Sequence, residues 1–282
     1  MQPPFSENLR IKKGGFLDKN NSIRDSKFCV DDRCLFQEAL YLGYLDTCRT
    51  IHPRNESKKT FNEKVKSLFK EEKGIAYYLQ DFFKRKHIEK AEAFDELHHK
   101  WCNFLIEQFK NKTGEPLKYG QAQKIINMAF KYLCCCVKID IFQDYFKFCH
   151  MPLDSVILEW IWRNRGKAEF SEMKINKSSI GPWSSINWSD DDKNDLDDEG
   201  QYTYMFYVRT IRRIIGDEKN PLEAEFSIWE DMQKELACEA FFFSLENKDQ
   251  KEKEGFKSKA LDEKMRVIIS LLKQYIKGDE AK

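Results

Sequence analysis

Apolar residues recur at helical spacing along most of this chain, and this periodicity constrains the fold more than its other features. Within residues 60–87, for example, Phe61, Val65, Leu68 and Phe69 fall on one face of a helix. Similar patterns cover much of the remaining chain, and no convincing alternating run predicts a β-sheet. The chain is therefore predicted to be all-α or mostly α, a compact multi-helix protein with about nine to eleven helices.

Glycine and proline residues divide this pattern into segments. Gly74 separates two helices within residues 60–87, and Lys112–Pro116 ends a long helix that begins at Ala91. The other helices are predicted at 31–50, 121–137, 154–165, 202–215, from Pro221 onward and 261–277, with a short aromatic segment at 140–148. Residues 1–30 are predicted to form an irregular arm, and 174–200 a long loop. Residues 31–282 form the predicted helical region, either as one body or as two lobes with a cleft near 117–165.

The composition fits a folded protein that buries a sizeable core. Of the 282 residues, 41% are hydrophobic and 34% are charged. The formal net charge of +1 excludes a polycation, so a nucleic-acid surface requires local segregation of charge. Residues 189–199 are strongly acidic, while basic residues cluster at Lys58–Lys73, Lys84–Lys90, Lys110–Lys124 and Arg209–Arg213.

The cysteines indicate a reduced protein. There are nine, an odd number, and Cys134, Cys135 and Cys136 are consecutive on an apolar segment, as small buried residues would be. The sequence has no signal segment at its start and no run of about 18 apolar residues, which predicts a cytoplasmic protein outside the membrane. The adjacent His98 and His99 point in different directions on a helix, so we predict no metal site, and no motif indicates a cofactor. The oligomeric state is left open.

Two helix starts carry the residues that suit chemistry. In the first, Gly120 precedes Lys124 by four residues at the start of an apolar helix. A glycine lets a phosphate or another backbone approach closely, and a helix N-terminus attracts anions. In the second, Asp154 follows Pro152-Leu153 and is placed as the N-cap of the next helix. Each also has a simpler interpretation: Lys124 as a solvated residue after a turn, and Asp154 as a helix cap alone.

Together the two segments resemble the helix-hairpin-helix DNA glycosylases, whose hairpin has the form G-x-G-x-K-x-x-N/D and is followed by a segment ending in aspartate. Gly120, Ala122, Lys124 and Asn127 fall in that order, and Pro152-Leu153-Asp154 resembles the second element. The resemblance covers residues 117–162. Ala122 replaces the second hairpin glycine, and the interval between the two elements is longer than in the family.

The resemblance implies a DNA glycosylase that excises a damaged or modified base, a base-excision hydrolase with possible AP-lyase activity. Asp154 would assist departure of the base, and Lys124 would attack the sugar C1′ to form a Schiff base. The remaining site residues implied are contacts to DNA by Lys118, Gly120, Gln121, Ala122 and Gln123, and a base pocket with Trp160 and Trp162. Trp183 and Trp188 are further candidates for this pocket, and the alternative for Trp160 and Trp162 is a place in the core.

Basic residues near the hairpin, among them Lys131, would add affinity for phosphate. DNA is the expected partner under this interpretation. The alternative is a non-enzymatic helical protein that binds nucleic acid or another protein, in a setting such as phage defence. A small-molecule-binding regulatory domain is the third class.

Overall fold

The computed structural model describes residues 27–51, 53, 55–85, 90–137, 142–165, 175–189, 195–216 and 219–246. Within these ranges the protein is built from α-helices and short 3-10 turns, with a single isolated bridge between Leu196 and Tyr202 and no strand. The predicted all-α fold is confirmed. The predicted helix at 261–277 and most of the predicted arm at 1–30 lie outside the described residues.

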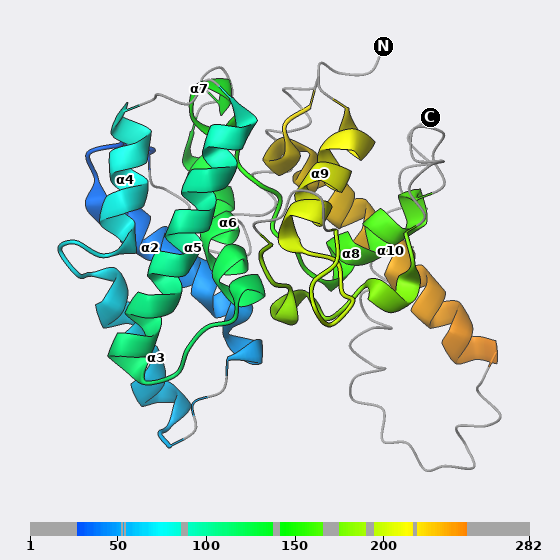
Figure 1. The fold of residues 1–282 in the computed structure, drawn as a ribbon, viewed down its shortest axis with the longest axis horizontal. Coiled ribbons are helices and arrows are strands. Elements are labelled where there is room, and N and C mark those ends of the chain that lie inside the picture. Colours follow the sequence, from blue (N-terminus) through cyan, green and yellow to red (C-terminus); the bar gives the residue numbers. More distant parts are fainter. Residues whose placement is uncertain are drawn as a thin grey trace, which may run out of the picture. The chain divides into compact units, whose positions relative to one another are not determined.

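Nine α-helices fall within the described ranges (Figure 1). They are α2 (Arg33–Thr47), α3 (Lys58–Phe69), α4 (Ile75–Arg85), α5 (Ala91–Thr113), α6 (Tyr119–Cys136), α7 (Phe142–Phe146), α8 (Ser155–Asn164), α9 (Tyr204–Ile215) and α10 (Pro221–Glu246). The 3-10 turns are η2 (Cys48–Thr50), η5 (Lys177–Ser179) and η6 (Trp183–Ser185).

Polar residues fix the ends of several helices. Asp32 accepts hydrogen bonds from the first amides of α2, Ser57 caps α3, and Thr203 caps α9. Such side chains satisfy backbone N–H groups that have no partner within the helix. At the other end of α5, Gly114 adopts φ +78°, a left-handed backbone that glycine accepts without strain. The end of α5 at Gly114 falls within Lys112–Pro116, the stop that the sequence predicts.

Helix α6 is the core element of the described fold. Every residue from Tyr119 to Cys134 is buried, and both α2 and α5 pack against this helix (Figure 1). The α2–α6 contact is unusually close at Gly43, where a Cβ atom would lie 2.4 Å from the carbonyl oxygen of Ile125. Because this helix is buried on all sides, each polar side chain on it needs a hydrogen-bond partner and each charged one needs an opposite charge.

The chain divides into two compact units, Met1–Phe226 and Ser227–Lys282. The described part of the second unit is the continuation of α10 to Glu246. All candidate site residues, including the predicted region 117–165, belong to the first unit. None of the helices in the described ranges is both long enough and apolar enough to cross a membrane.

Candidate active site

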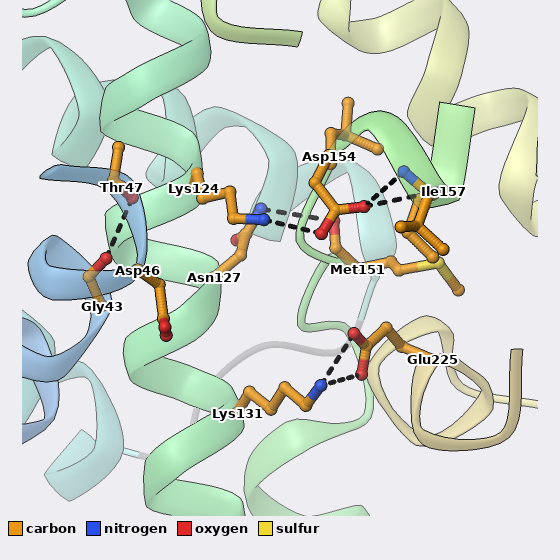
Figure 2. Close-up of polar contacts among 12 residues, drawn as sticks. Gly43, Asp46, Thr47, Lys124, Asn127, Lys131, Met151, Asp154, Ile157 and Glu225 are labelled. Carbon is orange, nitrogen blue, oxygen red and sulfur yellow. Dashed lines mark hydrogen bonds and ion pairs between the residues drawn. The ribbon is translucent and has the colours of Figure 1, made fainter. Parts of the chain in front are cut away.

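Lys124 and Asp154 meet in the folded chain. Lys124 lies on α6 and is only 7% exposed, and its Nζ is 2.7 Å from Oδ2 of Asp154 (Figure 2). Asp154 immediately precedes α8, so the two helix starts singled out in the sequence are brought side by side. The long interval between them is spanned by the remainder of α6, by α7 and by residues near Cys149.

The two oxygens of Asp154 have different partners. Oδ1 accepts hydrogen bonds from the amides of Val156 and Ile157, each at 3.0 Å, which makes Asp154 the N-cap of α8. Oδ2 accepts from Lys124. The carboxylate thus combines a capping role with a charge-assisted contact to an amine. Asp154 is therefore the helix cap that the simpler interpretation predicts, and it also contacts Lys124.

The start of α6 differs from the hairpin that was predicted to bind DNA. Gly120 donates its amide to Ile186 O at 3.0 Å, and a Cβ there would lie 2.0 Å from Trp183 O. The glycine therefore admits the protein's own backbone. Gln121, Ala122 and Gln123 are also buried within the helix. In this conformation these four residues face the interior and not a DNA strand.

The side chains of the two glutamines make internal hydrogen bonds. Gln121 Nε2 donates to Thr50 O at 2.8 Å, and Gln123 Nε2 donates to Leu153 O at 3.2 Å. Gln123 Oε1 also accepts from Leu153 N at 3.4 Å, so this side chain holds the residue that precedes Asp154. Lys118 remains exposed, with Nζ 3.3 Å from Ser185 Oγ, and is the predicted DNA contact that stays accessible.

A second buried ion pair lies farther along α6, between Lys131 and Glu225. The Lys131 Nζ is 2.8 Å from one Glu225 oxygen and 2.6 Å from the other (Figure 2). Lys131 is 4% exposed and Glu225 is 2% exposed, so Lys131 does not offer the predicted phosphate contact. Burial raises the pKa of Glu225, and the nearby Lys131 opposes that rise.

A third acidic residue, Asp46, interacts electrostatically with Lys124 and Lys131. It accepts a hydrogen bond from Tyr132 Oη at 2.9 Å. Burial raises the pKa of Asp46, while Tyr132 and the positive charges of Lys124 and Lys131 oppose the rise. Lys124 and Lys131 lie two turns apart on an apolar helix, and this spacing is a sequence signal from which acidic partners on neighbouring segments could have been predicted.

A chain of buried hydrogen bonds also reaches the site residues. Two nitrogens of Arg212 donate to the two oxygens of Asp95, at 2.6 and 2.8 Å, and His150 Nε2 lies 2.7 Å from Asp95 Oδ1. His150 Nδ1 is 2.9 Å from Tyr204 Oη, which in turn lies 3.0 Å from Asn127 Nδ2. These contacts join α5, α6, α9 and the segment that leads to Asp154.

The groups at the two ends of this chain decide which atom donates and which accepts in each hydrogen bond. A carboxylate only accepts, so His150 donates through Nε2, and its neutral Nδ1 accepts from the Tyr204 hydroxyl. Asn127 then donates to Tyr204, and its oxygen accepts from His98 Nε2 at 2.9 Å. Burial lowers the pKa of both histidines, consistent with these neutral forms.

Further contacts of Asn127 tie this chain to the site. Its Nδ2 donates to Gln123 Oε1 at 3.0 Å. The same nitrogen lies 3.5 Å from Met151 O (Figure 2). No sequence motif groups Asp95, His150, Tyr204 and Arg212, because their contacts join positions far apart in the chain.

Trp160 and Trp162 have separate surroundings. Trp160 is buried in the core. Trp162 is partly exposed, and the Arg165 guanidinium lies 3.4 Å from its ring centroid. A different tryptophan, Trp183, lies beside the ion pair, with its ring centroid 5.2 Å from Lys124 Nζ.

The described side chains include no group of three or more His, Cys, Asp or Glu residues arranged to hold a metal ion. Comparison with known proteins gave no match to a family model, to a curated protein or to a solved structure.

Proposed function

We propose that this protein is a DNA glycosylase with AP-lyase activity, in which Lys124 is the nucleophile and Asp154 is its acidic partner. The observation that carries the proposal is the 2.7 Å contact between Lys124 Nζ and Asp154 Oδ2. Two chain segments that resemble the glycosylase elements place their reactive groups in direct contact, as a lysine nucleophile and its acid require.

The pair supports a balanced chemical sequence. Transfer of a proton from the Lys124 ammonium to Asp154 leaves a neutral amine, which attacks C1′ of the deoxyribose. The glycosidic bond breaks, and the base leaves with the bonding electron pair and takes up the proton that Asp154 received from Lys124. The C1′–O4′ bond then breaks, the ring oxygen takes a proton from the attached nitrogen, and an iminium remains between Nζ and C1′. Asp154 is fixed for this role because its other oxygen is bound to the first amides of α8.

Borohydride trapping tests this proposal without knowledge of the base. The C1′ aldehyde of an abasic site condenses with a lysine amine, with loss of water, and borohydride reduces the imine to a stable secondary amine. We expect a covalent protein–DNA adduct with the wild-type protein and abasic duplex DNA. Peptide mapping by mass spectrometry should place the modification on Lys124.

A matched pair of variants provides the control. Lys124→Arg keeps a positive charge beside Asp154 but cannot form an imine, so the adduct should be lost. Lys131→Arg makes the same change two turns along the same helix, in the other buried ion pair, and should retain it. An adduct that persists in Lys124→Arg would reject Lys124 as the nucleophile. Absence of an adduct with the wild-type protein would favour the non-enzymatic alternative.

A further inference from the structure

The segment that leads to Asp154 is bound to α6 through its backbone. Residues 151–153 are buried and belong to no helix, so their backbone polar groups have no partner within a regular element. Buried backbone N–H and C=O groups nearly always have a hydrogen-bond partner. Two amide side chains of α6, those of Gln123 and Asn127, contact this backbone.

Gln123 binds both polar backbone groups of Leu153. Its Nε2 donates to Leu153 O at 3.2 Å, and its Oε1 accepts from Leu153 N at 3.4 Å. Nε2 also donates to Gly120 O at 2.9 Å, and Oε1 also accepts from Asn127 Nδ2 at 3.0 Å. An amide has two donor hydrogens and two acceptor positions, so this fully buried side chain is satisfied. A reversed amide would turn its NH2 group toward two other donors, so one orientation alone fits.

The spacing of the two amides on α6 matches the spacing of the backbone groups that they contact. Gln123 and Asn127 are four residues apart, which is about 6 Å along a helix. The carbonyls of Met151 and Leu153 are two residues apart, which is about 6.6 Å along an extended chain. Pro152 favours an extended conformation in the residue before it. Asn127 Nδ2 lies 3.5 Å from Met151 O, so the segment is attached to α6 at two points.

This attachment bears directly on the ion pair. Gln123 precedes Lys124 on α6, and Leu153 precedes Asp154 on the other segment. A contact between the first residues of these two neighbouring pairs therefore limits the distance between the second residues. The distance in the structure is 2.7 Å between Lys124 Nζ and Asp154 Oδ2.

We infer that Gln123 is a positioning residue: by holding the backbone of Leu153, it keeps the Asp154 carboxylate within proton-transfer distance of the Lys124 amine. This inference rests on the proposed function, in which Asp154 accepts the Lys124 proton. It gives Gln123 a role within the protein in place of the DNA contact that the resemblance implies. Such positioning matters for rate, because a displacement of about 1 Å at a reacting group can slow a reaction about a hundredfold.

Gln123→Met tests the inference, because methionine is of similar length and has no amide. The rate of borohydride adduct formation on abasic duplex DNA is measured with the full-length protein. We expect this rate to fall about tenfold or more, since Asp154 is no longer held opposite Lys124. An unchanged rate in a folded Gln123→Met protein would overturn the inference.

Gln108→Met is the matched control on α5. Gln108 is also buried and also contacts two backbone groups: its Oε1 accepts from Ile75 N at 3.2 Å, and its Nε2 lies 3.5 Å from Leu68 O. The same substitution therefore removes a similar set of contacts away from the ion pair. Gln108→Met should form the adduct at the wild-type rate, and an equal decrease in both variants would reject a specific role for Gln123.

A double variant separates positioning from a general loss of stability. Asp154→Asn keeps the helix cap and removes the carboxylate. If Gln123 acts through that carboxylate, then adding Gln123→Met to Asp154→Asn should slow adduct formation no further. A general structural defect would instead slow both backgrounds by the same factor, because independent effects combine additively in free energy. That result would also overturn the inference.

Reductive methylation provides a measurement that needs no DNA. Formaldehyde condenses with an accessible amine with loss of water, and borohydride reduces the imine; peptide mapping by mass spectrometry then gives the extent at each lysine. Lys124 is nearly inaccessible and should be modified slowly in the wild-type protein and in Gln108→Met. Gln123→Met should be modified at Lys124 about threefold faster or more, because the site opens more often. Lys131, in the other buried pair, should remain protected.

The two measurements distinguish this inference from the proposed function. No adduct with the wild-type protein, together with faster methylation of Lys124 in Gln123→Met, would reject the glycosylase chemistry and leave Gln123 as the residue that holds the pair. Unchanged methylation in Gln123→Met would reject that role, whether or not the wild-type protein forms an adduct. If circular dichroism shows that Gln123→Met is unfolded, Gln123→Asn takes its place. Its amide is one methylene too short to reach Leu153, and the same results are expected.

Discussion

At the residue scale, α6 holds two lysines in places that ordinarily exclude charge. Lys124 and Lys131 are both nearly inaccessible, and each directly contacts a carboxylate from another segment. Burial of an ion pair is costly because both charges lose hydration, and the mutual attraction offsets that cost only in good geometry. Removing one partner is therefore worse than removing both.

The Lys131–Glu225 pair gives a direct test of this asymmetry. Lys131→Met should lower the free energy of unfolding by about 3–5 kcal/mol, because it leaves the buried Glu225 carboxylate without its partner. The double variant Lys131→Met, Glu225→Leu should recover most of that loss. Urea unfolding measures both. A double variant no more stable than the single one would contradict a cost that arises from the unpaired charge.

Asp154 offers a second test, in which capping is separated from charge. Asn and Asp cap helices about equally well, whereas Ala does not, so Asp154→Asn should be about 1 kcal/mol more stable than Asp154→Ala. Both variants lose the acid that accepts the Lys124 proton and should form the borohydride adduct more slowly than wild type. Equal stability of the two variants would show that the cap contributes nothing to α8.

At the element scale, the packing of α2 on α6 depends on the absence of a side chain at Gly43. A Cβ there would lie 2.4 Å from Ile125 O and 3.2 Å from Ala129 N, and both atoms belong to a backbone that cannot rotate away. Gly43→Ala should therefore destabilise the protein by about 1–3 kcal/mol, although alanine is the better helix former.

Gly114→Ala is the comparison for Gly43→Ala. At Gly114 nothing lies within 4 Å of the added methyl group, so its cost should be only the about 1–2 kcal/mol of a left-handed backbone. Thermal unfolding of the two variants distinguishes the cases, because filling the Gly43 contact should also disturb α6. A stabilised Gly43→Ala protein would show that the two helices can separate without loss.

Helical periodicity and helix-end signals were sufficient to predict most elements in the described ranges. Gly74, Gly114 and Asp154 each lie at a predicted boundary, because their effects are local to a turn. The meeting of Lys124 with Asp154 was expected from the resemblance alone. At Gly120 the structure shows the close approach of another backbone, one of the two alternatives that the sequence left open, since a glycine that admits a phosphate and one that admits a carbonyl look the same in sequence.

At the scale of the whole molecule, the buried chain through His98 and His150 links stability to pH. Burial lowers the pKa of both imidazoles in the folded protein. At pH values between these lowered pKa values and the ordinary histidine value of about 6.5, the unfolded chain therefore binds more protons than the folded protein. Their contribution to stability is present above about pH 6.5 and declines as the pH falls below it. The partner Asp95 adds a decline at lower pH: burial raises its pKa, but hydrogen bonds from Arg212 and His150 outweigh burial and lower it overall.

Nuclear magnetic resonance tests this coupling directly. The imidazole signals of His98 and His150 should show no titration near pH 6.5 in the folded protein, and protonation should accompany unfolding. Asp46 and Glu225 act in the opposite sense, because acids with raised pKa values stabilise the fold less as the pH rises through those values. Ordinary titration of either imidazole in the folded state would contradict the direction assigned to the hydrogen-bond chain.

The complete burial of α6 from Tyr119 to Cys134 has a consequence for motion. Segments open independently, and those with the fewest exposed groups open last. Amide protons of α6 should accordingly exchange with solvent deuterium among the slowest in the chain, in step with global unfolding. Lys124 lies on this helix and is paired with Asp154, so its amine should stay in place for as long as the protein remains folded.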